Sequence, residues 1–90
     1  MLVRSQDNEK ITDRIEFLIM ITPSNKWGIW QPEKFRLFGE YSTQQKAIKV
    51  LDMLMKRYAD SMAVVLQENE ALYSAKIFTF PSEEEIPDEE

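Results

Sequence analysis

The side chains of this chain that could carry acid-base chemistry are carboxylates, because its 90 residues include no histidine and no cysteine. Imidazole proton shuttles, thiolate nucleophiles and the nitrogen and sulfur ligands of most transition-metal sites are therefore missing. Two carboxylates can still act as general acid and general base in a shielded cleft that separates their pKa values. The candidates are Asp7, Glu9, Asp13, Glu16 and Glu40. They lie beside bases such as Arg4, Lys10 and Arg14, so we interpret them as solvated surface charges.

The two glycines, Gly28 and Gly39, are too few for the glycine-rich loops that cradle phosphates. No Gly-x-Ser-x-Gly turn is present, although composition leaves a serine activated by a lysine open. Residues 7–9 offer oxygen ligands for a hard cation, but their spacing does not match a calcium loop and an Asx turn accounts for them. We therefore predict that the protein is not an enzyme and has no catalytic residue, cofactor or metal site.

The acidity of the chain is concentrated at one end. The net charge is −5, and six of the 16 acidic residues fall in residues 82–90, which contain no base. Residues 1–81 contain the remaining ten acidic residues and all eleven Lys and Arg residues, so their formal charge is +1. Like charges repel and Pro81 and Pro87 oppose a helix, so we predict a disordered acidic tail over 82–90. Its expected role is solubility, with binding of a basic partner as the alternative.

The spacing of apolar residues predicts strands in the first half of the chain. Residues 2–4 form a short strand that ends in a turn at 5–8, where Ser, Gln, Asp and Asn can bond nearby backbone. In the next segment, alternate positions are apolar, which points them toward one face of a core strand. These positions are Ile15, Phe17, Ile19 and Ile21. A helix over residues 13–20 is the competing interpretation.

Two further strands are expected at 26–31 and 34–39, separated by turn signals at Pro23 and Pro32. In the strand over 34–39, two sets of side chains are expected to point alternately to the two faces of the sheet. The first set is Phe35, Leu37 and Gly39, and the second is Lys34, Arg36 and Phe38. The first half is thus predicted to be an antiparallel meander.

A long amphipathic helix is predicted to follow. Ser42 with Gln45 three residues later is a capping-box arrangement, so the helix should begin near Thr43. Its apolar stripe must cover the sheet. The stripe comprises Ala47, Val50, Leu51, Leu54 and Tyr58. The helix could extend past Ser61, and residues 75–80 read as a last strand closed by Pro81, so residues 60–74 form either extra helix or an inserted loop.

These elements make one α+β domain over residues 1–81: an antiparallel β-meander of about five strands, packed by one long amphipathic helix, with a final strand after the helix. The apolar run 17–21 is too short to span a membrane, and no basic region followed by an apolar stretch opens the chain. The absence of cysteine fits any compartment, so a cytoplasmic protein is the default expectation.

Three segments resemble a group of small uncharacterised bacterial and phage-associated proteins. They are Leu2-Val3-Arg4-Ser5-Gln6-Asp7, Phe38-Gly39-Glu40-Tyr41-Ser42-Thr43 with the helix entry after it, and Ile77-Phe78-Thr79-Phe80-Pro81. Their order matches that group over nearly the whole chain. The resemblance implies the same fold and a bacterial or prophage origin, and the function of the group is unknown. The stretch between helix and last strand is longer here than in the common pattern.

The function that the composition favours is a small protein-interaction or regulatory module. Trp27 and Trp30 are three residues apart, so in a strand they point to opposite faces and one should be exposed as a binding anchor. A helix, a loop or a second copy of the chain could instead cover them, and a homodimer is an open possibility. The predicted surface comprises Trp27, Trp30, Lys34 and Arg36. These aromatic and basic residues also fit the alternative, binding of single-stranded nucleic acid, which the acidic tail opposes.

Overall fold

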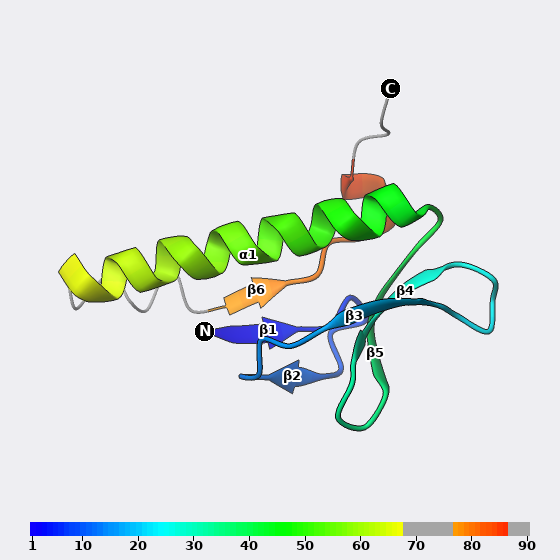
Figure 1. Ribbon diagram of the computed structural model, residues 1–90, viewed down its shortest axis with the longest axis horizontal. Coiled ribbons are helices and arrows are strands. Elements are labelled where there is room, and N and C mark those ends of the chain that lie inside the picture. The colour runs from blue at the N-terminus through cyan, green and yellow to red at the C-terminus, as the bar shows by residue number, and fades with distance from the viewer. Residues whose placement is uncertain (68–76, 87–90) are drawn as a thin grey trace.

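The computed structural model describes residues 1–67 and 77–86, with side chains described outside 61–67. It has the predicted α+β architecture, with five strands before one long helix and a strand after it (Figure 1). The elements are β1 (Leu2–Arg4), β2 (Ile11–Thr12), β3 (Leu18–Ile21), β4 (Trp27–Gln31), β5 (Arg36–Tyr41), α1 (Gln44–Gln67), β6 (Ile77–Thr79) and a 3₁₀ turn, η1 (Glu83–Glu85).

The strands divide into two three-stranded sheets. The predicted meander is β3-β4-β5, which is antiparallel throughout. The second sheet has the order β2-β1-β6, in which β1 pairs antiparallel with β2 and parallel with β6. A parallel pair needs a long crossover connection. Here the chain between β1 and β6 includes α1, which runs along both sheets (Figure 1).

The predicted core strand over residues 15–21 is shorter and less buried than expected. Only Leu18–Ile21 of this segment forms a strand, and β3 lies at the edge of its sheet, with β4 as its only neighbour among the described strands. Ile15, Phe17 and Ile19 pack partly buried against the core, but Ile21 is 52% exposed. The reason is the edge position, because a side chain at the end of an edge strand has a neighbouring strand on one side only.

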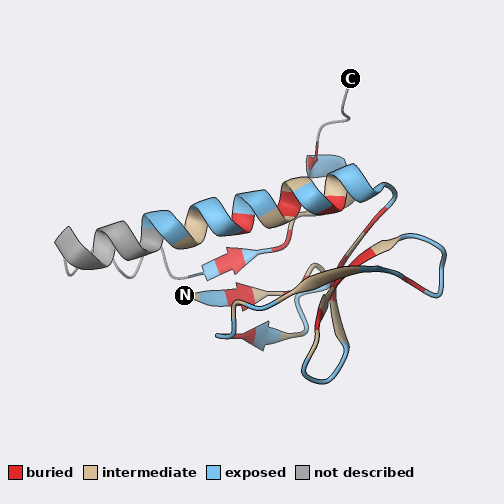
Figure 2. Ribbon diagram, in the orientation of Figure 1, coloured by how far each residue is buried: buried red, intermediate tan, exposed pale blue. Residues whose placement is uncertain are grey.

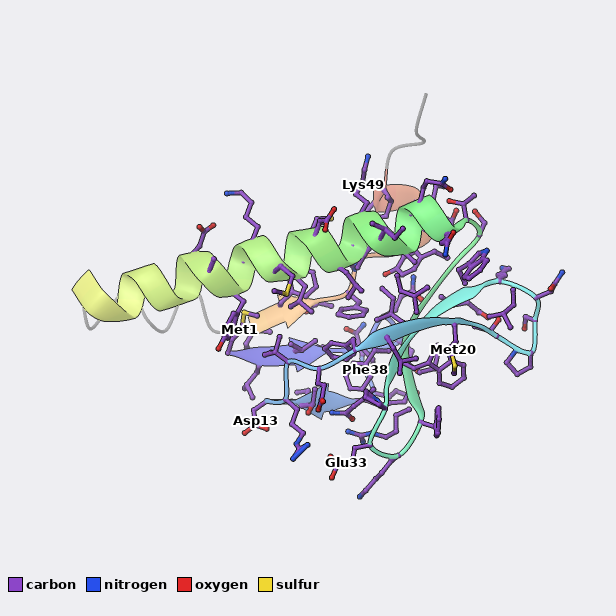
Figure 3. The ribbon with its side chains drawn as sticks, viewed as in Figure 1. Met1, Asp13, Met20, Glu33, Phe38 and Lys49 are labelled. Carbon is purple, nitrogen blue, oxygen red and sulfur yellow. The ribbon has the colours of Figure 1, made fainter. Side chains whose placement is uncertain are left out.

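A β-bulge overturns the predicted alternation in β5. Leu37 and Gly39 were expected on one face, but Leu37 pairs with Trp30 and Gly39 pairs with Ile29, which are on opposite faces of β4. Phe38 is the extra residue of this bulge, since the register shifts between Ile29 and Trp30. Figure 3 shows Phe38 among the side chains beneath the helix, where it is fully buried. A bulge changes the strand's phase: Phe38 stays on the side of Arg36, as the alternation predicted, but Gly39 lies on that same side rather than with Leu37.

The turn before β5 is also longer than predicted. The strand begins at Arg36 rather than Lys34, and the backbone N–H of Phe35 donates to the carbonyl of Pro32 (3.3 Å). Phe35 has a φ of 50° and is 61% exposed. A bulky residue in this left-handed region is unusual, so the turn holds Phe35 in a strained backbone conformation away from the core.

The helix stripe is confirmed, and its cap lies one residue later than predicted. Ala47, Val50 and Leu54 are buried against the sheets. The backbone N–H of Lys46 donates to Thr43 Oγ1 (3.1 Å), so Thr43 is the N-cap and the predicted Ser42 capping box does not form. The helix continues through Gln67. The rest of the 60–74 stretch, like the predicted strand residues 75 and 76, lies outside the described residues.

The core is an apolar layer between α1 and the sheets (Figure 2). Four rings meet in it, with centroids 5.3 to 6.1 Å apart; they belong to Phe17, Phe38, Phe78 and Phe80. Gly39 makes room for this cluster, because a Cβ there would lie 2.7 Å from Phe80 Cδ2. The last strand behaves as predicted, with Phe78 buried and Ile77 exposed on the opposite face.

The acidic segment differs from the expected disordered tail. Residues 82–86 follow β6 into η1, and Ile86 is buried in the core at 3% exposure. The acidic segment packs against the domain because the Glu83 carboxylate accepts hydrogen bonds from Ser42 and Lys46 at the start of α1. Residues 87–90 of the predicted tail lie outside the described residues.

Candidate functional site

The structure separates the four residues of the predicted surface. Trp27 is half-buried on the face of the β3-β4-β5 sheet that contacts the core, and Trp30 is half-buried on the opposite face. Lys34 is exposed in the turn between β4 and β5. Arg36 donates through Nε and Nη2 to Gln31 Oε1 (3.1 and 2.9 Å) on the Trp27 side. The aromatic and basic side chains therefore do not form one platform.

The opposite faces of Trp27 and Trp30 agree with their spacing, but neither indole is fully exposed. Trp30 lies over Gly28, where a Cβ would be only 2.8 Å from Trp30 Nε1 and 2.7 Å from Leu37 Cδ1. The indole N–H donates to the carbonyl of Met20 (3.2 Å). Glycine at this position leaves room for the indole, and Trp30 is half-buried there.

Trp30 belongs to an apolar surface on the side of the sheet away from α1. Cross-strand pairing aligns Leu18 with Trp30 and Trp30 with Leu37, and places Met20 beside Gly28. Met20 is 38% exposed and lies on the far side of the sheet from the helix (Figure 3). We call this surface the outer apolar face; its residues are Leu18, Met20, Trp30 and Leu37.

The outer apolar face ends at the free edge of β3. The backbone N–H of Thr22 donates to the carbonyl of Lys26 (2.8 Å). In this antiparallel register every second residue bonds the neighbouring strand, so the backbone N–H and C=O groups of Met20 and Leu18 also point toward β4. The intervening residues, Ile19 and Ile21, direct their N–H and C=O groups away from the sheet. Among residues 1–67 and 77–86 these groups have no strand partner. This edge was not predicted, because the alternation of apolar residues in the segment also fits a strand in the core.

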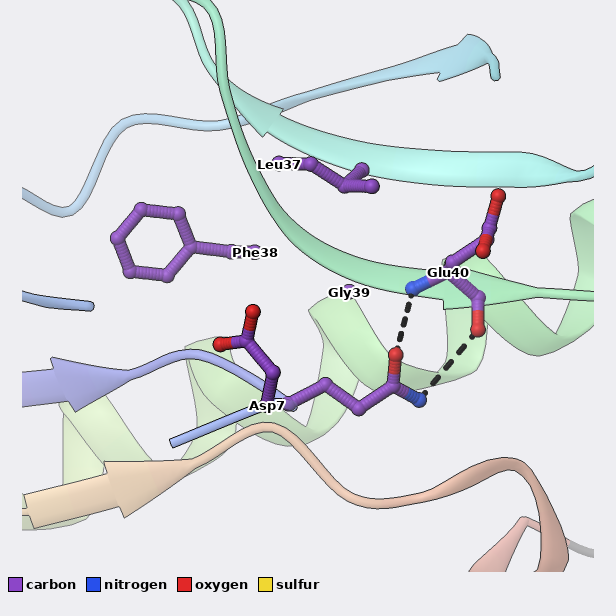
Figure 4. A pocket seen from close by; sticks show the side chains of 6 residues that line it. Asp7, Leu37, Phe38, Gly39 and Glu40 are labelled. Atoms are coloured by element: carbon purple, nitrogen blue, oxygen red, sulfur yellow. Dashed lines mark hydrogen bonds between the residues drawn. The ribbon is translucent and has the colours of Figure 1, made fainter. Parts of the chain in front are cut away.

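The three segments that carry the sequence resemblance converge at one junction. The Gln6 side-chain amide accepts from the N–H of Glu40 (2.9 Å) and donates to the carbonyls of Glu40 (3.4 Å) and Pro81 (3.1 Å), partly drawn in Figure 4. The hydroxyl of Tyr41 also donates to Pro81 (2.7 Å). Burial, followed by Glu83 and Glu85, raises the pKa of Tyr41 above its ordinary value. The hydrogen bonds tie the first turn, β5 and the end of β6 together.

A surface hollow of about 180 Å³ adjoins this junction, lined by Gln6, Asp7 and residues 37–40 (Figure 4). The Ser5 hydroxyl donates to Asp7 Oδ1 (2.5 Å). This hydrogen bond, together with those from the backbone N–H of Glu9 and the side chain of Lys10, lowers the pKa of Asp7 to about 2. The carboxylate of Glu40 accepts from Thr22 Oγ1 (2.6 Å). Asp7 stays ionised near neutral pH and its bonds close the turn, which is the structure predicted for residues 5–8.

The start of α1 holds the acidic contact that the sequence did not reveal. Glu83 accepts from the N–H of Ser42 (2.9 Å), from Ser42 Oγ (2.6 Å) and from Lys46 Nζ (2.6 Å). The Lys46 and Ser42 hydrogen bonds lower the pKa of Glu83 to about 2. Because the partners are about 40 residues apart in the chain, no local pattern could have indicated their contact.

Over residues 1–67 and 77–86, no three His, Cys, Asp or Glu side chains gather as a metal ion would require. None of the described helices is both long and apolar enough to cross a membrane. Comparisons with protein-family models, curated proteins and solved structures found no match. The resemblance to small bacterial and phage-associated proteins therefore stays a prediction.

Proposed function

We propose that this protein is an interaction module that binds another protein through the outer apolar face and the free edge of β3. The observation that carries the proposal is the junction of two features on one strand. Ile19 and Ile21 present backbone groups that no described strand pairs with, and Leu18 and Met20 present apolar side chains beside Trp30.

Within residues 1–67 and 77–86 nothing protects this edge, which supports the proposal. Proteins commonly block an exposed edge strand with a lysine, a proline, a bulge or a covering segment. β3 has the sequence Leu-Ile-Met-Ile, without charge or proline, and the bulge of this sheet lies between β4 and β5 rather than at the free edge. An extended partner segment could therefore add to the sheet by main-chain hydrogen bonds, with side-chain contacts giving specificity.

The neighbouring indole gives this edge an anchor. Tryptophan is enriched among the residues that contribute most to protein binding. Trp30 is held in place by Met20 and Gly28, so little side-chain freedom would be lost when a partner covers it. The other exposed apolar side chains of the described chain lie apart from this edge, on β1, β2, β6, the β4-β5 turn and the helix.

The predicted alternative, single-stranded nucleic-acid binding, receives less support. Stacking platforms combine aromatic and basic side chains on one surface. Here Arg36 is engaged by Gln31 and by the Phe38 ring (5.6 Å), on the side of the sheet opposite Trp30. No observation favours this alternative over protein binding.

A pull-down from native lysate tests the proposal with two matched variants. Met20→Lys places a charge on the outer apolar face, and Met53→Lys places the same charge on α1 at nearly equal exposure, 38% against 40%. We expect wild type and Met53→Lys to capture the same protein and Met20→Lys to lose it, with circular dichroism unchanged. Equal capture by both variants would refute the surface. Capture that disappears with nuclease treatment would instead support nucleic-acid binding.

A further inference from the structure

We infer that the partner at the β3 edge is a second copy of this chain, paired antiparallel through β3 about a twofold axis. The inference rests on the proposed interaction surface and names its occupant. It follows from how β3 matches itself in hydrogen bonding and in the apolar side chains it brings together.

The hydrogen-bonding groups of β3 fit one self-pairing. When Ile19 of one copy lies opposite Ile21 of the second, both pairs are of the hydrogen-bonded kind and each exchanges its two N–H···O bonds. Shifting the strands so that Ile21 faces Ile21 would place Ile19 opposite Pro23, which has no N–H to donate. Shifting them so that Ile19 faces Ile19 would pair Ile21 with Phe17, which is outside the strand. The Ile19–Ile21 register alone keeps both pairs within β3.

This register joins the two outer apolar faces. Met20 would lie opposite Met20 of the second copy in a non-hydrogen-bonded pair, the kind in which side chains approach most closely. Leu18 and Met20 point to the same face as Trp30 and Leu37, so the two sheets would form one six-stranded sheet with a continuous apolar surface. The Met20 side chains would be covered at the centre of the interface.

The charges near β3 do not oppose an antiparallel copy. The strand itself has no charged residue, and so it brings no like charges together. The nearest charged residue before the strand, Glu16, is exposed and ion-paired with Arg14 (3.9 Å), and in this register it would lie opposite Ser24 of the second copy.

Sedimentation of two Ile21 variants tests the backbone pairing. Ile21→Pro removes an N–H that points away from β4, so the hairpin keeps its own hydrogen bonds, whereas Ile21→Thr keeps that N–H. We expect wild type and Ile21→Thr to reach the dimer mass as concentration rises and Ile21→Pro to remain near half that mass. A wild type that stays monomeric throughout, or an Ile21→Pro dimer as tight as wild type, would overturn the inference.

Cross-linking provides a test that does not depend on the proline variant folding. The chain has no cysteine, so Met20→Cys would be its single thiol. The proposed pair brings the two Cα atoms within the range that a disulfide spans, about 4.4 to 6.8 Å. We expect mild oxidation to link Met20→Cys into a covalent dimer much faster than Met53→Cys, which has similar exposure. Equal cross-linking would refute the pairing.

The two proposals fail in different ways. If wild type is a monomer but Met20→Lys still loses a captured protein that Met53→Lys retains, the proposed pairing with a second copy is wrong and the proposed interaction surface is supported. If Met20→Lys changes neither the mass nor the capture, the surface itself is wrong.

Discussion

Replacing Glu83 by glutamine should weaken the protein by removing the charge that docks the acidic segment on α1. The carboxylate accepts hydrogen bonds from Lys46 Nζ (2.6 Å), Ser42 Oγ (2.6 Å) and the Ser42 N–H (2.9 Å). The Lys46 side chain is 12% exposed and that of Glu83 is 33% exposed. This contact is therefore shielded more than an ordinary surface ion pair, though not fully buried.

The lowered pKa of Glu83 sets an upper limit on the effect. Its hydrogen bonds with Lys46 and Ser42 lower the pKa from 4.5 to about 2. A change of this size corresponds to at most about 3 kcal/mol of folding free energy. Solvent screening of a side chain that is one-third exposed reduces this, and we expect Glu83→Gln to cost about 1 to 2 kcal/mol. For a domain of this length, each kcal/mol lowers the melting temperature by roughly 4 to 8 °C.

The pH dependence identifies the carboxylate as the cause. Because folding lowers the pKa of Glu83, the stabilisation is complete above pH 4.5 and is lost as the pH falls from 4.5 toward 2. Urea unfolding of wild type and Glu83→Gln should therefore give free energies that differ by a constant amount near neutral pH. The two should converge as the pH approaches 2.

The matched control is Glu84→Gln, which removes the same charge from the neighbouring exposed position. We expect it to change the free energy of unfolding by less than about 0.5 kcal/mol. An equal loss in both variants would mean that net charge, and not the contact with α1, is responsible. A Glu83→Gln loss that persists unchanged at pH 2 would likewise refute the reasoning.

Three further substitutions test the account of the fold. Gly28→Ala should cost about 1 to 3 kcal/mol and shift tryptophan fluorescence, because the added Cβ would displace Trp30. Thr43→Ala should cost about 1 kcal/mol in urea unfolding, because it removes the N-cap of α1. Gln6→Ala should cost about 2 kcal/mol by the same measurement, because it leaves the backbone N–H of Glu40 without its acceptor and removes one of the two donors to the Pro81 carbonyl.

Exposed positions provide the controls for these variants. Thr79→Ala on β6 and Gln44→Ala on α1 make comparable changes at exposed sites, and each should stay within about 0.5 kcal/mol of wild type. A Thr43→Ala effect no larger than that of Thr79→Ala would contradict the assigned cap. Unchanged fluorescence in Gly28→Ala would contradict the position of the indole over this glycine.

Local patterns predicted the parts of the fold that depend on near neighbours. The helix stripe repeats every three to four residues, so Ala47, Val50 and Leu54 could be placed without knowing what they contact. The antiparallel hairpins follow from alternation and turn residues in the same way. The side of the sheet for Trp27 and Trp30 was also predictable from their spacing.

The parts that failed depend on contacts distant in sequence or on broken periodicity. The bulge at Phe38 reverses the alternation, and the parallel pairing of β6 with β1 joins the two ends of the domain. The candidate surface also depends on contacts distant in sequence. Ile19 and Ile21 look like core residues in the sequence, and only the sheet order shows that their strand is at an edge.

Backbone amide exchange measured by NMR tests the central claim most directly, because it reports which edge a partner covers. The free protein should exchange fast at the amides of Ile19 and Ile21 and slowly at Met20, whose N–H points toward β4. Raising the protein concentration, or adding a captured protein, should slow exchange at Ile19 and Ile21 and leave Met20 unchanged. Protection that instead appears on α1 or β6, with Ile19 and Ile21 still fast, would contradict binding at the β3 edge.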